Sequence, residues 1–438
     1  MNKIKVEIPI KRGFHLIYFY KMTITRIIII VMSKVIYEKV FLFLLCLLLY
    51  NINRGESMKI LIKNGIVIID GKKRIDNGAV LVEDNKIISV MKDYRGVEAD
   101  EYIDAKGNYI VPGFIETHTH GILGHDFNTC QQGDIQTISD GHLKEGVTCF
   151  MASLTCEVHQ QMLDLLDMYE NCNVHNMLGV HVEGPFLSEH YKGVMKPEAL
   201  QSPSQRTFEE FLEHCSKIKS MTIAPELKGS LDLITYGNSK GIVMNVGHSN
   251  ATASQVMEAQ YYGAKGITHL YNAMAQHLHR EPGVVTGAMI SDLMCELIVD
   301  GFHIHEDVIK ATYKAIGKER IILICDANPC KGLPDGSYTF SGKNVEIIDG
   351  KARVKETGRI AGSTITLNKA GYNMMKWCGC RIDDVILMAS VNPAKQYGLN
   401  KGKLEVGYDG DVLVVNDELD VLAVINEGAI KIKSSYVD

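Results

Sequence analysis

Eight short apolar runs, each ending in a polar or charged residue, are the feature that most limits how this 438-residue chain can fold. They occupy residues 109–120, 146–155, 176–184, 220–226, 241–249, 265–273, 295–301 and 320–327. Runs of this length that are rich in Val, Ile and Leu are typical of strands buried on both faces, as in a parallel sheet covered by helices. Stretches with a helical pattern separate many of them, for example 132–144, 159–171, 204–218, 249–262 and 306–316. This alternation predicts an α/β fold, a (β/α)8 TIM barrel with right-handed crossovers.

Both ends of the chain carry a different pattern, that of short strands separated by turns. Residues 58–70 alternate between apolar and polar side chains, and residues 77–90 carry two strand-like runs around a turn. Residues 402–417 and 422–432 are again short strands bounded by Gly and Asp. Helical patterns at 365–378 and 383–391 lie between this tail and the eighth apolar run. We therefore expect 58–108 and 392–438 to join as one small β-sandwich domain, and 109–391 to form the catalytic barrel.

The first 57 residues differ in kind from the rest. Their apolar runs, 27–32 and 40–50, are shorter than the roughly 20 residues that a helix needs to span a bilayer. Basic residues before the second run are compatible with a signal peptide or anchor. Alternatively, residues 54–57 can be encoded by a purine-rich stretch just before an ATG, so that translation starts at Met58. We expect residues 1–57 to be a non-native extension, with a genuine signal or anchor as the alternative.

Composition excludes several classes of protein. The chain is 46% hydrophobic and 22% charged, as in an ordinary globular protein. Its net charge is −6 and residues 58–438 contain no Lys/Arg-rich block, so nucleic acid is not an expected partner.

The 11 cysteines are odd in number and scattered through apolar runs, which favours reduced thiols and a cytoplasmic protein. Cys378 and Cys380 form CGC without the second pair of a four-sulfur zinc site. No membrane partner is expected unless residues 1–57 are genuine.

Several residues at the ends of the apolar runs are types that bind divalent metals. His118 and His120 are two positions apart on a strand, so both imidazoles face one side. Glu183 precedes a Gly-Pro turn, and His248 and His269 end two successive runs. Taken singly, each of these residues could instead be structural. Because active sites of barrels form where the carboxyl ends of the strands meet, we expect the five side chains to converge on metal.

Asp326 ends the eighth apolar run. Beside a metal-activated water, a carboxylate is suited to accept the proton of that water and to pass it to a leaving group. Capping of the following segment is its alternative role. Asp326 is expected across the barrel mouth from the metal ligands, and this position favours the catalytic role over capping.

These motifs together resemble the amidohydrolase superfamily, and within it the deacetylases of N-acetylated amino-sugar phosphates. In family order, residues 58–438 contain PGFIETHTHG, HVEGPF, NVGHS, THLYNAM, REPG, DGFH, DA after the eighth run, AGS, NPA and a closing DGDVLVV. The resemblance implies Glu183, His248 and His269 as metal ligands, His118 and His120 as an additional ligand pair, and Asp326 as the catalytic carboxylate. It implies substrate contacts at Asn272, Ala273, Arg280, His303, Ala361, Gly362 and Ser363.

The resemblance also implies a reaction and an assembly. The expected reaction releases acetate from N-acetylglucosamine 6-phosphate with the help of one or two divalent ions per subunit, zinc or iron. His303 corresponds to a residue that completes the phosphate site of a neighbouring subunit, so a homodimer is expected. Alternatives are the C4-epimeric substrate, N-acetylgalactosamine 6-phosphate, and a non-catalytic barrel scaffold. A dihydroorotase or nucleobase deaminase is opposed by the EGPF and LYNAM motifs.

One position departs from the family pattern. Some relatives carry a His after the Gly-Pro turn that polarises the substrate carbonyl, where this chain has Met195. A thioether cannot donate a hydrogen bond. A second metal at His118 and His120 could supply the missing electrophile, and His190 in the same loop is another candidate.

Overall fold

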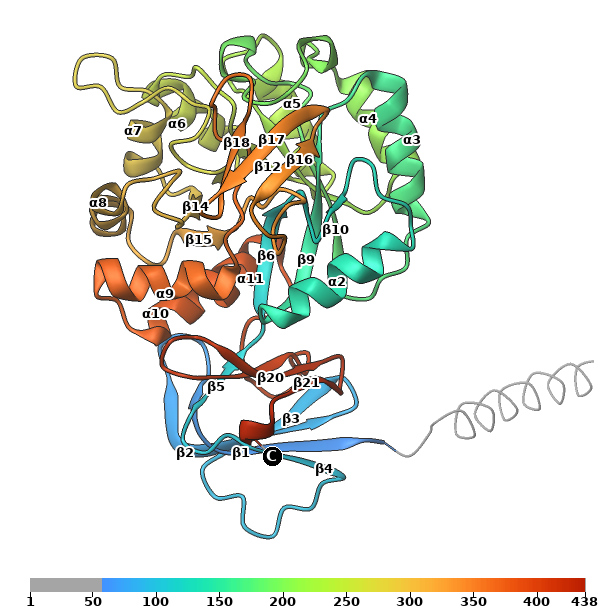
Figure 1. Cartoon of the computed structure of the whole chain (residues 1–438). Helices are drawn as coiled ribbons and strands as arrows, with labels where there is room; N and C mark the ends of the chain where they lie inside the picture. Colours follow the sequence, from blue (N-terminus) through green and yellow to red (C-terminus); the bar gives the residue numbers. More distant parts are fainter. Residues whose placement is uncertain (1–56, 438) are drawn as a thin grey trace, which may run out of the picture. The chain divides into compact units, whose positions relative to one another are not determined.

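The computed structural model describes residues 57–437, and the chain divides into the units Met1–Ser57 and Met58–Asp438. Apart from Ser57, the first unit lies outside the described residues, and so does the predicted extension, signal or anchor. The second unit holds every element described below (Figure 1). None of the described helices is long and apolar enough to cross a membrane.

Eight parallel strands form the barrel that the apolar runs predict. In chain order they are β6 (Phe114–Thr119), β9 (Val147–Thr155), β10 (Met177–Glu183), β11 (Ile218–Ile223), β12 (Val243–Val246), β13 (Gly266–Ile267), β14 (Met294–Ile298) and β15 (Ile321–Ile324). Each strand pairs with the next along the chain. A parallel bridge between Thr119 and Ala327 brings the first and last strands together. The prediction of a TIM barrel is therefore confirmed.

Helices cover the outside of the barrel (Figure 1). They are α2 (Asp134–Lys144), α3 (His159–Glu170), α4 (Gln205–His214), α5 (Ser230–Ser239), α6 (Ala253–Tyr261), α7 (Val284–Ile290), α8 (Glu306–Ile316), α9 (Leu367–Cys378), α10 (Ile382–Ile386) and α11 (Asn392–Tyr397), with a π-helical turn at Leu387–Val391. Local signals set their starts: Thr252 caps α6 in a capping box with Gln255, and Ser204 accepts a hydrogen bond from Thr207 N at the start of α4. Helix α8 has the bounds that the sequence predicts.

Both ends of the described chain join in one mixed sheet, as expected. Its strands are β1 (Lys59–Ile68), β2 (Arg74–Glu83), β3 (Lys86–Met91), β4 (Glu101–Asp104), β5 (Tyr109–Pro112), β19 (Val412–Val415), β20 (Val421–Asn426) and β21 (Ala429–Lys433). They follow the order β21-β20-β19-β5-β1-β2-β3, with β4 paired to β1. Rather than two separate sheets, one continuous sheet surrounds a small core that includes Ile62, Val80 and Val414.

The domain boundaries differ from the expected residues 109 and 392. Strand β5 pairs with β1 and β19, so Tyr109–Pro112 belongs to the small sheet. Gly113 lies between β5 and β6, and a side chain is excluded there because a Cβ would lie 2.0 Å from Thr148 Oγ1. At the other boundary, Asn392 Nδ2 donates to the carbonyls of Lys318 and Ile321, at 2.8 and 2.7 Å. Helix α11 therefore packs on the barrel.

A three-stranded antiparallel sheet follows the last barrel strand and was not predicted. It consists of β16 (Gly336–Phe340), β17 (Lys343–Ile348) and β18 (Lys351–Val354), and we call it the flap. The turns Ser341-Gly342 and Asp349-Gly350 connect its strands, and all four of these residues have positive φ. That conformation is typical of tight hairpins. The Asp-Gly pair was the sequence signal for a hairpin here.

Candidate functional site

Three predicted metal ligands converge at the mouth of the barrel. Glu183 is the last residue of β10, while His248 and His269 lie two residues beyond β12 and β13. The Nε2 atoms of both imidazoles lie 3.0 Å from Glu183 Oε1 and 3.0 Å from each other. All three side chains are buried. This group, which we call the Glu183 cluster, has the composition and spacing of a metal site.

A second cluster lies beside the first. His118 and His120, at the end of β6, have their Nε2 atoms 3.3 Å apart, and His120 Nε2 lies 3.3 Å from Asp326 Oδ1. We call this group the His118 cluster. The Glu183 carboxylate faces both groups, since Oε1 lies 3.5 Å from His118 Nε2 and Oε2 lies 3.4 Å from His120 Nε2. Glu183 is therefore placed to bridge two cations.

The tautomers of these histidines show that the donor set fits a metal. Three of the four imidazoles have a hydrogen-bond acceptor at Nδ1. The acceptors are the Glu296 carboxylate for His118 at 3.1 Å, the Ser153 carbonyl for His120 at 3.0 Å and the Tyr191 carbonyl for His248 at 2.8 Å. When Nδ1 carries the proton, Nε2 has a free lone pair, and this lone pair points toward the other ligands. A cation between the ligands would accept these lone pairs.

The electrostatics of the site also favour cations. Burial alone would raise the pKa of Glu183, but His118 and His248 outweigh it, and the pKa lies well below its usual range. The pKa of Asp326 is likewise lowered against its burial, by His118 and His120. Conversely, burial lowers the pKa of His118, yet Glu183 and Asp326 raise it to about 10. Without a cation Nε2 of His118 is therefore protonated, and a bound cation would displace this proton. Both carboxylates are therefore anionic at neutral pH, and their field attracts positive charge.

Three of the site residues have unusual backbone conformations. His248, His269 and Asp326 have φ values of 48°, 32° and 46°. The left-handed region is uncommon for residues with a side chain and costs about 1–3 kcal/mol each where the surroundings impose it. Here it occurs just beyond the carboxyl ends of β12, β13 and β15, where the chain turns and the side chains reach the barrel mouth.

A cavity of about 380 Å³ opens over the two clusters. Its lining residues are His120, Glu183, His190, Tyr191, Gly193, Val194, Met195, His248, His269, Asn272, Ala273, His303, Asp326, Phe340, Arg359, Ile360 and Gly362. A cavity of this size accommodates a small polar metabolite. The predicted Asn272, Ala273, His303 and Gly362 therefore share one space with the ligand clusters. Ala361 and Ser363 are buried beside it, and Ser363 N donates to Asp326 O at 2.8 Å.

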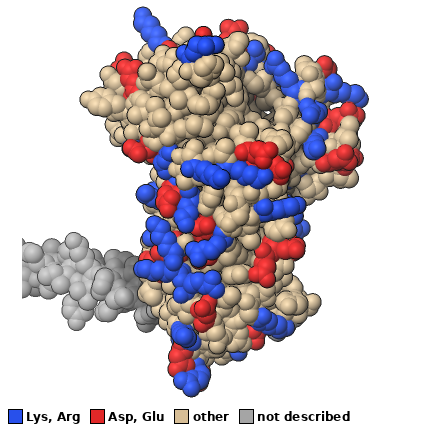
Figure 2. Space-filling model, turned by 90° about the vertical axis from the view of Figure 1, so that its left-hand side faces the viewer, with Lys and Arg blue, Asp and Glu red and all other residues tan. Residues whose placement is uncertain are grey.

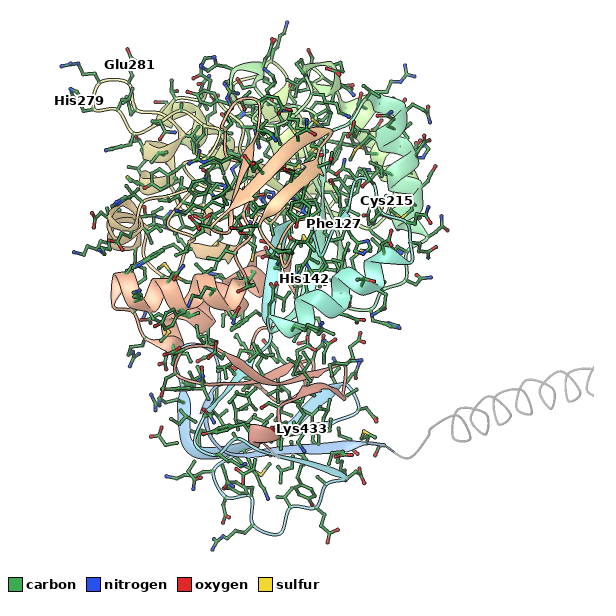
Figure 3. All side chains as sticks on the ribbon, in the orientation of Figure 1. Phe127, His142, Cys215, His279, Glu281 and Lys433 are labelled. Atoms are coloured by element: carbon green, nitrogen blue, oxygen red, sulfur yellow. The ribbon has the colours of Figure 1, made fainter. Side chains whose placement is uncertain are left out.

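Two predicted phosphate contacts occupy unexpected places. His303 was expected to reach a neighbouring subunit, but it lines the cavity of its own chain, with Nδ1 2.6 Å from Asp300 Oδ2. Arg280 does not line that cavity. It lies in an exposed loop, and its neighbours His279 and Glu281 mark the tip of this loop in Figure 3. Sequence motifs alone cannot determine which way such a loop extends.

Other residues near the site were missed by sequence reasoning. Phe340 and Arg359 reach the cavity from the flap and from the segment after it. His181, two positions before Glu183, donates to or accepts from Ser153 and Thr222 inside the barrel, at 3.0 and 2.9 Å. Glu296, in the middle of strand β14 and near the start of an apolar run, lies 3.1 Å from His118 Nδ1 through its Oε2 atom. The sequence does contain a signal for His181. It is a polar residue in the apolar run 176–184, two positions before Glu183, so both side chains lie on the same side of the strand.

Comparisons with known proteins agree with this geometry. Residues 109–431 match the amidohydrolase family. The N-acetylglucosamine-6-phosphate deacetylase of Bacillus subtilis (strain 168) is 32% identical over 397 residues, which cover 88% of this chain and 99% of that protein. The enzyme of the same name from Lysinibacillus sphaericus is 31% identical over 390 residues, covering 86% and 99%.

Solved structures agree as well. A mutant N-acetyl-D-glucosamine-6-phosphate deacetylase from Mycobacterium smegmatis, in complex with N-acetyl-D-glucosamine-6-phosphate, superposes with a TM-score of 0.81 at 28% identity. The match covers 86% of this chain and 100% of that one. The deacetylase from Thermotoga maritima gives a TM-score of 0.78 at 29% identity, covering 85% and 100%.

Proposed function

The chain belongs to the amidohydrolase family, and we propose that it is a metal-dependent enzyme that hydrolyses N-acetylglucosamine 6-phosphate to glucosamine 6-phosphate and acetate. The observation that carries this proposal is the pair of buried ligand clusters that share Glu183, with Asp326 beside them at the mouth of the barrel. The expectation of an amidohydrolase is confirmed by the family match.

We propose two divalent cations per subunit, zinc or iron, because imidazole and carboxylate ligands suit both metals. The Glu183 cluster would hold one and the His118 cluster the other. When bound, such cations lower the pKa of water and polarise a carbonyl group. The second cation would also replace the electrophile that Met195 cannot provide.

The roles of the chain's own residues follow from their positions. Asp326, ionised at neutral pH, accepts a proton from the attacking water as the new C–O bond forms. It then donates this proton to the sugar nitrogen as the C–N bond breaks, so that acetate and the amine leave. Asn272, Ala273 and the segment from Ala361 to Ser363 are placed to orient the sugar, and His303 to contact its phosphate.

An acetate-release assay tests the proposal. The protein, supplied with zinc or iron, is incubated with N-acetylglucosamine 6-phosphate, with its C4 epimer N-acetylgalactosamine 6-phosphate, and with unphosphorylated N-acetylglucosamine. We expect the first to be the best substrate. Acetate release from none of the three with any metal would contradict the proposed reaction.

Metal content should distinguish two sites from one. Protein loaded with excess zinc and freed of unbound metal should carry two ions per chain by elemental analysis. His118→Ala should carry one, because the Glu183 cluster remains complete. The exposed His175, remote from both clusters, provides the control, and His175→Ala should still carry two. A wild-type protein that never exceeds one ion per chain would rule out the second site.

We further propose a homodimer that works in the cytoplasm. The ten described cysteines are all free and most are buried, as suits a reducing compartment. Large apolar side chains are exposed along α6, α7, α8 and the Arg280 loop: Tyr261, Tyr262, Leu278, Ile290 and Val308. Figure 2 shows this side of the molecule, whose upper part has a broad area of uncharged side chains. Such a patch suits contact with a second copy, which would bring Arg280 to the partner's cavity.

Mixing two inactive variants tests this arrangement. Asp326→Asn and Arg280→Ala chains are each expected to be impaired. In a mixed dimer, one site keeps its own Asp326 and receives an intact Arg280, so activity should recover, up to half of the wild-type value for that dimer. Two differently tagged copies of the same variant, mixed in the same way, give the baseline. No recovery despite proven subunit exchange would place Arg280 in the site of its own chain.

A further inference from the structure

Three hydrogen bonds close a ring between the His118 cluster and the backbone of Asp326. Oε1 of Glu116 accepts from His118 N and Oε2 accepts from Cys325 N, both at 2.9 Å. Asp326 N, the next amide after Cys325, donates to the His118 carbonyl, also at 2.9 Å. The Glu116 carboxylate therefore connects a predicted metal ligand with the residue that immediately precedes the proposed proton acceptor.

The ring lies at the seam of the barrel, where β6 and β15 meet as the first and last strands (Figure 1). In the part of the chain that the structure describes, no ladder pairs these two strands, apart from the bridge between Thr119 and Ala327. Buried backbone amides that a continuous ladder would pair need another acceptor. Glu116 supplies an acceptor for two of them, so its carboxylate takes the place of backbone carbonyls where the barrel closes.

The burial of Glu116 shows which property of a carboxylate is needed here. The side chain is fully buried, and among the described residues none forms an ion pair with it. Lys331, which is also fully buried, pairs with Glu145 instead, at 2.8 Å. A buried, unpaired carboxylate costs free energy that a neutral side chain would not. It differs from the amide of Gln in having two acceptor atoms, and two acceptors are what the seam requires.

Asp326 needs support from its surroundings because its backbone is strained. Its φ of 46° lies in the left-handed region, which a residue with a side chain keeps only where its neighbours impose it. The Cys325 carbonyl accepts from Ser363 Oγ, and Ser363 N donates to Asp326 O at 2.8 Å. Together with the ring, these bonds give a partner to all four polar backbone atoms of residues 325 and 326. The Asp326 side chain is thereby held with Oδ1 3.3 Å from His120 Nε2 and 3.8 Å from His118 Nε2.

We propose that Glu116 is a positioning residue that sets the distance between the His118 cluster and the Asp326 carboxylate, and so prepares the second cation site and the proton acceptor together. This inference rests on the proposed function, because it names a further residue of the same site. Glu116 does not line the cavity. It acts through the backbone amides of His118 and Cys325.

Glu116→Gln tests the proposal, since the amide keeps the size of the side chain but leaves one of the two N–H groups without an acceptor. We expect kcat for N-acetylglucosamine 6-phosphate to fall about 10- to 100-fold, the usual effect of losing a group that supports a ligand, with KM close to the wild-type value. Wild-type turnover would overturn the proposal, and so would a loss that appears in KM rather than in kcat.

Glu116→Asp is the conservative variant, because it keeps both acceptors on a shorter side chain. It should retain more activity than Glu116→Gln, and the reverse order would contradict the role of the two acceptors. If Glu116→Gln does not fold, Glu116→Asp takes its place, and it should still turn over more slowly than the wild type at an unchanged KM.

Zinc titration measures the second cation site without any turnover. In competition with a chromophoric chelator, the wild type should bind two ions. Glu116→Gln should bind the first ion as the wild type does and the second about 10- to 100-fold more weakly. His118→Ala, which lacks a ligand of the second site, gives the limiting case. Two ions bound by Glu116→Gln as tightly as by the wild type would overturn the proposal.

Asn392→Ala is the matched structural control. Asn392 also binds the backbone of β15, since its Nδ2 donates to the carbonyls of Lys318 and Ile321, but at the opposite end of the strand from Asp326. This variant should lower the melting temperature while kcat and zinc binding stay at wild-type values. A loss of kcat in Asn392→Ala as large as that in Glu116→Gln would mark the effect as general destabilisation and would overturn the proposal.

Failure of the proposed reaction would give a different result. If the wild type releases no acetate while zinc titration still separates Glu116→Gln from the wild type, the reaction is wrong and the positioning of the His118 cluster by Glu116 stands. If acetate is released and zinc binding is the same in both proteins, the reaction stands and the role of Glu116 is wrong.

Discussion

Asp326→Asn should reduce turnover about 10²- to 10⁴-fold while metal content and substrate affinity stay close to those of the wild type. The amide keeps the shape of the side chain but cannot accept the proton of the attacking water. Asp326 also belongs to the His118 cluster, with Oδ1 3.3 Å from His120 Nε2, so metal content must be measured together with kcat. Turnover within tenfold of the wild type would exclude Asp326 as the proton acceptor.

A neutral substitution of an aspartate elsewhere on the barrel is the control for Asp326→Asn. Asp292 is exposed and does not line the cavity over the ligand clusters. Asp292→Asn should therefore keep the wild-type rate and metal content. If the Asp326 variant loses metal as well as turnover, the measured fold-change combines two effects and overstates the contribution of proton transfer.

Glu183→Gln should have the other large effect, the loss of both metals. The Glu183 carboxylate lies between the two clusters, with its oxygens 3.0 to 3.5 Å from the Nε2 atoms of four histidines. An amide removes the negative charge that both cations would share. We expect metal affinity to fall by more than about 100-fold, since even indirect ligand-supporting groups contribute 10- to 100-fold. Activity at limiting metal should fall below detection.

Elemental analysis and metal titration measure this second effect, with circular dichroism to check that the fold is kept. The contrast with Asp326→Asn is the informative result, because one variant should keep metal and lose turnover while the other loses both. Retention of two ions by Glu183→Gln would exclude Glu183 as a bridging ligand.

The barrel and its ligand clusters could be predicted from the sequence because both depend on local pattern. A strand buried on both faces needs a continuous apolar run, and the residue at its carboxyl end must lie at the barrel mouth. This pattern predicts that Glu183, His248, His269 and Asp326 lie in one region, and they do. Their left-handed backbones and the hydrogen bonds at Nδ1 depend on neighbours far along the chain, and no local pattern encodes them.

The features that the sequence analysis missed or misplaced also depend on contacts between residues far apart in the chain. The run 109–120 reads as one strand, but it divides at Gly113, since β5 pairs with β19 in the small sheet and β6 pairs with β9 in the barrel. The flap was missed because its strands are short and mostly polar, although its Asp-Gly turn was visible. Arg280 and His303 both lie in family motifs, yet loop direction decides which of them faces the cavity of its own chain.

Strand β5 lies between β1, near the start of the described chain, and β19, near its end. During synthesis, β5 and all eight barrel strands are made before residues 412–415. One edge of β5 therefore stays without a hydrogen-bonding partner until the chain is almost complete, and unpaired edges are where chains aggregate. A chain cut short before β19 would keep every residue of the candidate active site. It would still expose this edge, so the last strands protect the nascent enzyme as well as completing the small sheet.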